Sequence, residues 1–243
     1  MNSQNKINHL FMAFRKFLHE NARRLLYYAA LMFAAMLLSY LIFAIIPVLS
    51  RPQSNLNYAD EIMQISIFLL FVFGCLSASI MFRELRNRRT RIAYVCFPTT
   101  KFEKYIVEWF VYVLLFPVVF LLLSELSVKL LIAILHFSVE STKSMENISV
   151  TEQLIEFAKS ENSVFLFFLA VQSCFVIGSA YWRKFPFIKT FLCIVGISVA
   201  LFFYALHSKN QDVLIAYNYV YLIFTLIAWA LSYIVFRRNA TLV

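Results

Sequence analysis

The residues with the strongest chemical character lie in one basic segment. Arg83, Arg86, Arg88, Arg89 and Arg91 place five arginines within nine positions. A fixed positive charge of this density attracts anionic lipid or the acidic surface of a partner. Two interpretations follow. The arginines fix the orientation of the chain in a membrane, or they form a docking loop for a cytoplasmic partner.

The residues after the arginines carry helix signals. Residues 92–97 are apolar enough for a short helix against a membrane surface, and Pro98 ends that stretch. Thr100 and Glu103 have the spacing of a capping box, in which each side chain accepts a hydrogen bond from the other residue's backbone amide. We therefore expect a helix to begin at Thr100 or Lys101 and to run directly into an apolar span.

The remaining titratable residues show no catalytic or metal-binding spacing. Glu108 follows Lys104 by one helical turn, which favours an i,i+4 ion pair, with a proton-coupled role as the alternative. No Ser/His/Asp, HExxH or P-loop pattern is present in the sequence. We therefore expect no catalytic residue, metal site or cofactor in this chain. The scattered histidines and cysteines are His9, His19, His136, His207, Cys75, Cys96, Cys174 and Cys193.

Composition determines the broad class of the protein. Of the 243 residues, 62% are hydrophobic and 14% are charged, against about 45–50% and about 25% in soluble domains. The apolar residues come in long blocks, which argues against a soluble enzyme, a disordered chain or a secreted disulfide scaffold. We predict an all-α integral membrane protein with one transmembrane domain over residues 1–243.

Six blocks are long enough to cross a bilayer, which requires about 20 apolar residues. The predicted spans are residues 25–49, 62–82, 106–123, 163–182, 190–206 and 213–236. Pro117 predicts a kink in the third span. Small residues around Gly74 and Gly178 predict close packing of the second and fourth spans against other helices. The tyrosines from Tyr217 to Tyr221 are interpreted as interfacial belt residues.

The basic residues are distributed asymmetrically between the predicted loops. Seventeen of the 22 Lys and Arg residues lie on one side of the six spans. Basic loops mark the cytoplasmic side, so both termini are expected in the cytoplasm of a multi-pass protein. The net charge of +9 is then explained by topology, and no nucleic-acid partner is predicted.

Two segments outside the spans have helical patterns. Residues 1–24 carry an apolar stripe that includes Phe11, Phe14 and Phe17, which predicts an amphipathic helix lying in the membrane interface. The predicted external segment, residues 124–162, begins with an extension of the third helix. Ser149 and Glu152 then form a second capping box, which predicts a small external helix.

The loop at residues 83–105 resembles the first cytoplasmic loop of ABC-transporter permeases of the type-two exporter family. Phe97-Pro-Thr-Thr-Lys-Phe-Glu-Lys104 is similar to the Leu-Pro-(small)-Ser/Thr-x-x-Glu-Lys signature of small six-span bacterial permeases, with Phe97 where Leu is usual. The N-terminal interfacial helix, the six spans and the cytoplasmic termini also resemble that family, which implies the bacterial cytoplasmic (inner) membrane.

The resemblance implies a permease subunit that forms a homodimer or heterodimer in the lipid bilayer and binds separate ATP-binding P-loop subunits. ATP hydrolysis would then take place in those partners, and this chain would work by alternating access, as an exporter. The resemblance assigns partner docking to the coupling loop residues Arg86, Arg88, Arg89, Arg91, Tyr94, Phe97, Pro98, Thr100, Lys101, Glu103 and Lys104. The alternative is a non-transporting membrane scaffold or sensor that anchors a cytoplasmic partner through the same loop.

Overall fold

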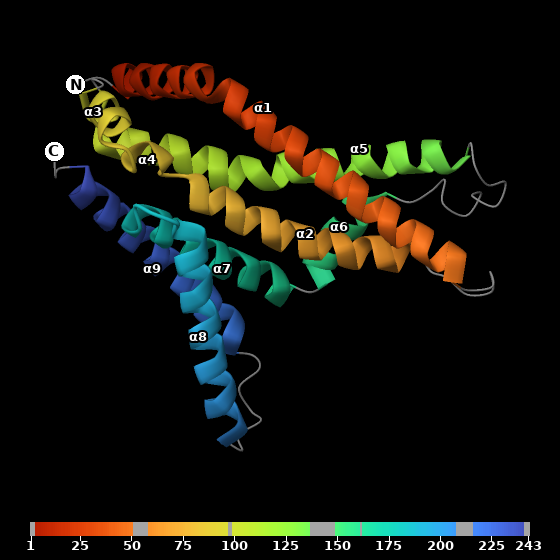
Figure 1. The fold of residues 1–243 in the computed structure, drawn as a ribbon. Helices are drawn as coiled ribbons and strands as arrows, with labels where there is room; N and C mark the ends of the chain where they lie inside the picture. The colour runs from red at the N-terminus through yellow and green to blue at the C-terminus, as the bar shows by residue number, and fades with distance from the viewer. Residues whose placement is uncertain are drawn as a thin grey trace. The chain divides into compact units, whose positions relative to one another are not determined.

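The computed structural model describes residues 3–50, 58–96, 99–136, 149–160, 162–207 and 216–240 of the chain. Within these ranges the chain is helical apart from short turns, and it contains no β-strand. The elements in chain order are α1 (Ser3–Ser50), α2 (Tyr58–Ile80), the 3-10 turn η1 (Arg83–Leu85), α3 (Arg88–Cys96), α4 (Lys101–Trp109), the π-helical segment η2 (Phe110–Leu115), α5 (Phe116–His136), α6 (Val150–Ser160), α7 (Asn162–Tyr181), α8 (Pro186–His207) and α9 (Ala216–Asn239) (Figure 1).

Five stretches of helix in the described residues are long and apolar enough to cross a membrane. They are Phe11–Phe43, Ile62–Ile80, Lys101–Ile134, Asn162–Tyr181 and Tyr219–Asn239. Large apolar side chains such as Leu122, Leu192 and Leu226 are more than half exposed on these helices or on α8, which suits contact with lipid better than contact with water. The chain is therefore an all-α, multi-pass membrane protein, as the composition predicts.

The predicted span boundaries agree with the helices to within a few residues for α2, α7 and α9. The predicted fifth span, residues 190–206, lies inside α8, whose described apolar part is the shorter stretch Pro186–Val199. α1 is one uninterrupted helix, so the predicted interfacial segment 1–24 and the first span are continuous.

The third span belongs to one long run of helix from Lys101 to His136. The sequence predicts a kink at Pro117, and the structure contains the π-helical segment η2, which ends two residues before the proline. Pro117 has no N–H for the carbonyl of Val113, and its ring crowds that carbonyl, so a wider turn precedes it. The Tyr112 carbonyl within η2 accepts a hydrogen bond from Ser77 Oγ of α2 at 2.9 Å.

The contacts divide the chain into two compact units. One contains Met1–Phe17, Gly74–Leu114 and Glu161–Val243, and the other contains Leu18–Phe73 and Leu115–Ser160. In the second unit, the hydroxyls of Tyr40 on α1 and Ser66 on α2 are 2.7 Å apart and both residues are fully buried. Ser66 Oγ also donates to the Ile62 carbonyl at 2.7 Å.

The short helix α6 packs against α5 within the second unit. The predicted capping interaction is present, because the Glu152 amide donates to Ser149 Oγ at 3.3 Å. Glu125 of α5 then accepts hydrogen bonds from the amide and hydroxyl of Thr151 at 3.2 and 3.1 Å, and Lys129 lies 3.5 Å from the same carboxylate. Residues 137–148 of the predicted external segment lie outside the described residues.

The first unit contains the helices that position the basic loop. α7 packs along α9 and against α8, and the rings of Phe175 and Phe187 stack with centroids 5.3 Å apart. Gly178 faces Thr190 of α8 so closely that a Cβ at residue 178 would lie 1.8 Å from Thr190 Oγ1 and 2.9 Å from Thr190 Cβ. This contact confirms the packing role predicted for the small residues of α7.

Replacing Gly178 with alanine should therefore destabilise the protein, because Thr190 must move to admit the methyl group. We expect Gly178→Ala to cost about 1–3 kcal/mol and to lower the unfolding temperature in detergent. Gly196→Ala is the matched control, since nothing lies within 4 Å of its Cβ position, and alanine favours a helix over glycine by about 1 kcal/mol. Equal unfolding temperatures for G178A and the wild type would contradict the close contact.

Candidate functional site

The arginine-rich loop between α2 and α4 is more helical than the sequence predicts. The sequence indicates a short helix only at residues 92–97, whereas α3 begins at Arg88. Thr90 Oγ1 donates to the carbonyls of Glu84 and Asn87 at 2.7 and 3.1 Å, which holds the first turn. Arginine is also a good helix former, so the basic residues extend the helix. Phe97 and Pro98 of the predicted docking set lie outside the described residues.

The second half of the loop contains the predicted capping box. Thr100 Oγ1 accepts from the Glu103 amide at 3.3 Å, and Glu103 Oε2 accepts from the Thr100 amide at 2.9 Å. α4 therefore begins at Lys101, as predicted, and continues without a break into η2 and α5. Thr100 and Glu103, which the resemblance assigns to docking, have this structural role, while Lys101 is half-buried.

Lys104 joins α3 to the first turn of α4. Its Nζ donates to the carbonyls of Tyr94 and Val95 at 2.6 and 3.4 Å and lies 5.1 Å from the centroid of the Tyr94 ring. These carbonyls belong to the last turn of α3, where a cation also complements the helix dipole. Only 8% of Lys104 is exposed. Its ammonium is therefore bound inside the protein, where it connects two helices.

An aromatic seam fastens α4 to α9. It consists of Phe102, Tyr105 and Trp109 on α4 and Trp229, Tyr233 and Phe236 on α9. Both sets follow spacings of three or four residues, so each forms one stripe along its helix. Trp109 and Trp229 meet edge to face at 4.9 Å between centroids, and Phe102 meets Tyr233 at 5.6 Å. Such pairs contribute about 0.5–1.5 kcal/mol each beyond burial.

Tyr105 is the centre of the seam and its main polar link. Its hydroxyl donates to the Trp229 carbonyl at 3.0 Å and lies 2.7 Å from Ser232 Oγ. Its ring contacts Tyr233 and Phe236 of α9, and it stacks on Phe82, just beyond the end of α2, at 5.8 Å. The start of the third predicted span is thus fixed to the last span and to the base of the basic loop.

Tyr94 and Glu108 occupy the interior beneath α3. The Tyr94 ring meets Phe236 edge to face at 6.3 Å. Burial raises the pKa of the Tyr94 hydroxyl well above its usual value, and the nearby Glu108 carboxylate raises this pKa further. Glu108 is only 2% exposed. The hydrogen bonds of Lys104 go to backbone carbonyls of α3. Lys104 and Glu108 also interact electrostatically, in line with their i,i+4 spacing.

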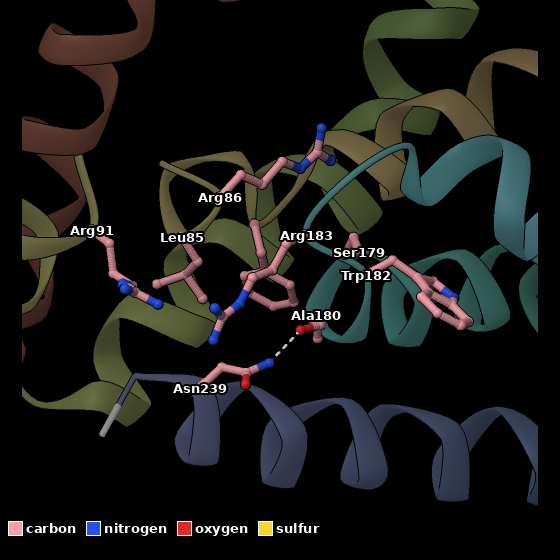
Figure 2. Close-up of a pocket in the computed structure, with 9 residues that line it drawn as sticks. Leu85, Arg86, Arg91, Ser179, Ala180, Trp182, Arg183 and Asn239 are labelled. Carbon is pink, nitrogen blue, oxygen red and sulfur yellow. Dashed lines mark hydrogen bonds between the residues drawn. The ribbon is translucent and has the colours of Figure 1, made fainter. Parts of the chain in front are cut away.

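The structure separates the arginines of the loop into two groups. Arg88 and Arg89 are exposed on α3. Arg86 and Arg91 are partly buried and line a pocket with Arg183 (Figure 2). Arg86 also donates to the carbonyl of Ser79 in the last turn of α2. The remaining lining residues are Phe82, Leu85, Ser179, Ala180, Trp182 and Asn239.

Sequence reasoning missed the residues that complete this region. Trp229, Tyr233 and Phe236 form an aromatic stripe at helical spacing that is visible in the sequence, whereas the tyrosines interpreted as belt residues, Tyr217 to Tyr221, lie nearer the start of α9. Arg183 and Asn239 carry no local signal that connects them to Arg91. No group of three or more His, Cys, Asp or Glu residues able to hold a metal ion is found in the described part of the chain.

Loss of the Lys104 ammonium should free the end of α3. We expect Lys104→Ala to accelerate amide hydrogen exchange in residues 88–96 about tenfold or more, because hydrogen bonds to a charged group contribute about 1.5–3 kcal/mol. Lys101→Ala is the control, because this substitution removes one positive charge from the same helix, α4. Exchange measured by mass spectrometry should stay at the wild-type rate in K101A. Wild-type exchange in K104A would show that Lys104 does not hold α3.

Comparison with models of known protein families, with curated proteins and with solved structures found no match to this chain.

Proposed function

We propose that this chain is the membrane-spanning permease subunit of an ATP-driven ABC transporter, working as an exporter by alternating access. In this proposal α8 is the fifth of six spans, both termini lie in the cytoplasm, and the membrane is the bacterial inner membrane. The permease pairs with a second permease, and separate P-loop subunits hydrolyse ATP. The observation that carries the proposal is the attachment of α3 to the helix that begins the third span.

A transporter driven by a separate ATPase requires a surface that receives motion and a stiff connection that carries it. The exposed side of α3 offers Arg88 and Arg89 beside Ile92, which is 42% exposed. Basic and apolar groups together suit an acidic partner surface with an apolar cleft. The Lys104 contacts and the capping box then join α3 to α4, which continues into the membrane.

The aromatic seam supports the same proposal, because it couples two spans to the loop. A displacement of α3 would reach α4 through Lys104 and α9 through Tyr105. Packed aromatic side chains resist deformation, so the three helices would move as one piece. Alternating access needs such rigid-body motion of helices past one another.

Charge reversal on the exposed side of α3 should abolish association with the ATPase. The full-length tagged protein is purified in mild detergent from its native membrane, and the proteins that co-purify are identified. We expect a stoichiometric P-loop ATPase with the wild type, and at least tenfold less of it with Arg88→Glu/Arg89→Glu, because like charges then face each other across the interface.

The matched control is Arg237→Glu/Arg238→Glu, which reverses the same number of exposed charges at the end of α9. This variant should retain the ATPase. Retention by R88E/R89E as well would show that α3 is not the docking helix. A lone protein, or a partner without a P-loop, would contradict the transporter proposal and would favour the membrane scaffold or sensor.

A further inference from the structure

The pocket lined by Arg91 and Arg183 is built from three parts of the first unit. Arg91 comes from α3, Arg183 from the turn between α7 and α8, and Asn239 from the end of α9. Figure 2 shows the guanidinium groups of Arg91 and Arg183 reaching toward the same space near Asn239, whereas Arg86 extends in another direction. Two segments that are distant in sequence thus bring their cations to one place.

Neither of these two guanidinium groups is neutralised by the protein. In the described part of the chain, Arg91 and Arg183 form no ion pair, and none of the described lining residues is acidic. Arg91 Nε is buried and has no hydrogen-bond partner among the described residues. Like charges in a partly buried site repel one another unless an anion lies between them. The pocket therefore has the electrostatic character of an anion site.

The walls of the pocket are fixed by their own hydrogen bonds. Asn239 Nδ2 donates to the Ala180 carbonyl at 2.7 Å, as the dashed line in Figure 2 marks, and Ser179 Oγ donates to the Val176 carbonyl at 2.8 Å. The Trp182 ring is held by a cation–π contact with Lys189, whose Nζ lies 4.7 Å from the ring centroid. The Asn239 amide N–H and the Ser179 hydroxyl are therefore already engaged. The guanidinium groups of Arg91 and Arg183 are the groups that can bind a ligand.

The depth of the pocket selects among anions. Candidate spans end at Ile80, Tyr181 and Asn239. Phe82, Arg183 and Asn239 lie within two positions of these ends, and α3 brings Arg91 to the same pocket from farther along the loop. Tyr181 and Trp182, whose rings meet at 4.8 Å, are typical of the boundary between bilayer and water. At this depth the abundant anions are lipid phosphates, and basic pockets between spans on the cytoplasmic side bind such headgroups.

We infer that Arg91 and Arg183 bind a phosphate group, that of an anionic phospholipid at the end of α2, α7 and α9. Each guanidinium presents two N–H groups to the phosphate oxygens. The pocket is small, so the phosphate sits at its mouth and the acyl chains stay in the bilayer. Arg91 then belongs to a lipid site, while Arg88 and Arg89 remain for a protein partner.

The test uses the full-length protein in detergent after its native lipids have been removed. Its unfolding temperature is followed while dioleoyl phosphatidylglycerol, dioleoyl phosphatidylcholine or inorganic phosphate is added. We expect saturable stabilisation by phosphatidylglycerol and little by phosphatidylcholine. Arg91→Gln/Arg183→Gln should raise the apparent Kd for phosphatidylglycerol about tenfold or more, since hydrogen bonds to charged groups are lost.

The control variant is Arg83→Gln/Lys184→Gln, which removes one exposed cation from η1 and one from the turn between α7 and α8 and leaves the residues that line the pocket unchanged. It should bind phosphatidylglycerol like the wild type. An equal loss in the control, or equal stabilisation by phosphatidylcholine, would overturn the inference.

If the double variant does not fold, R183Q alone tests the same site, because Arg183 is exposed on a turn. Stabilisation of the wild type by inorganic phosphate that R91Q/R183Q abolishes, with no further effect of phosphatidylglycerol, would identify a soluble phosphate compound as the source.

Discussion

The burial of Tyr105 between α4 and α9 is the contact on which the described site depends. The tyrosine brings together the start of the third predicted span, the end of α2 at Phe82 and the last span at Trp229 and Tyr233. Helices in a bilayer gain little from the hydrophobic effect between themselves, so close packing and interhelical hydrogen bonds must hold them. Tyr105 supplies both, because its ring stacks while its hydroxyl reaches a carbonyl and a serine. Together with the other pairs of the aromatic seam, Tyr105 fixes α4, and Lys104 of α4 in turn binds the end of α3.

The charged residues of the loop divide into three roles that the sequence presents as one. Lys104 is bound inside the protein, Arg91 lines a pocket with Arg183, and Arg88 and Arg89 remain exposed. On α3, Arg91 and Tyr94 are one turn apart and both are partly buried, whereas Arg88 and Arg89 at the start of the helix are exposed, and Lys104 belongs to α4. A basic loop can therefore interact with lipid on one side and with a protein partner on the other.

The sequence predicts the class and most of the helices, because long apolar blocks and capping boxes are local signals. The helix start at Lys101 and the cap at Ser149 were both predictable in this way. Contacts between segments that are distant in sequence have no such local signal. Lys104 binds backbone carbonyls, whose position depends on the path of α3. Arg183 and Arg91 line one pocket only because the end of α7 and the first turn of α3 lie beside it. The start of α3 was predicted too late because the arginines were interpreted by charge alone, although arginine also favours helix.

The most direct test of this arrangement is the distance between α3 and α9 in the intact protein. One spin label is attached to the exposed native Cys96 and a second to Arg237→Cys, after Cys75, Cys174 and Cys193 have been replaced by serine. Pulsed electron paramagnetic resonance then measures the distance between the two labels. If Lys104 and Tyr105 hold α3, α4 and α9 as one rigid piece, the measurement gives a single narrow distance distribution. A broad distribution, or several separate distances, would mean that α3 moves independently of the spans and could not transmit motion to them.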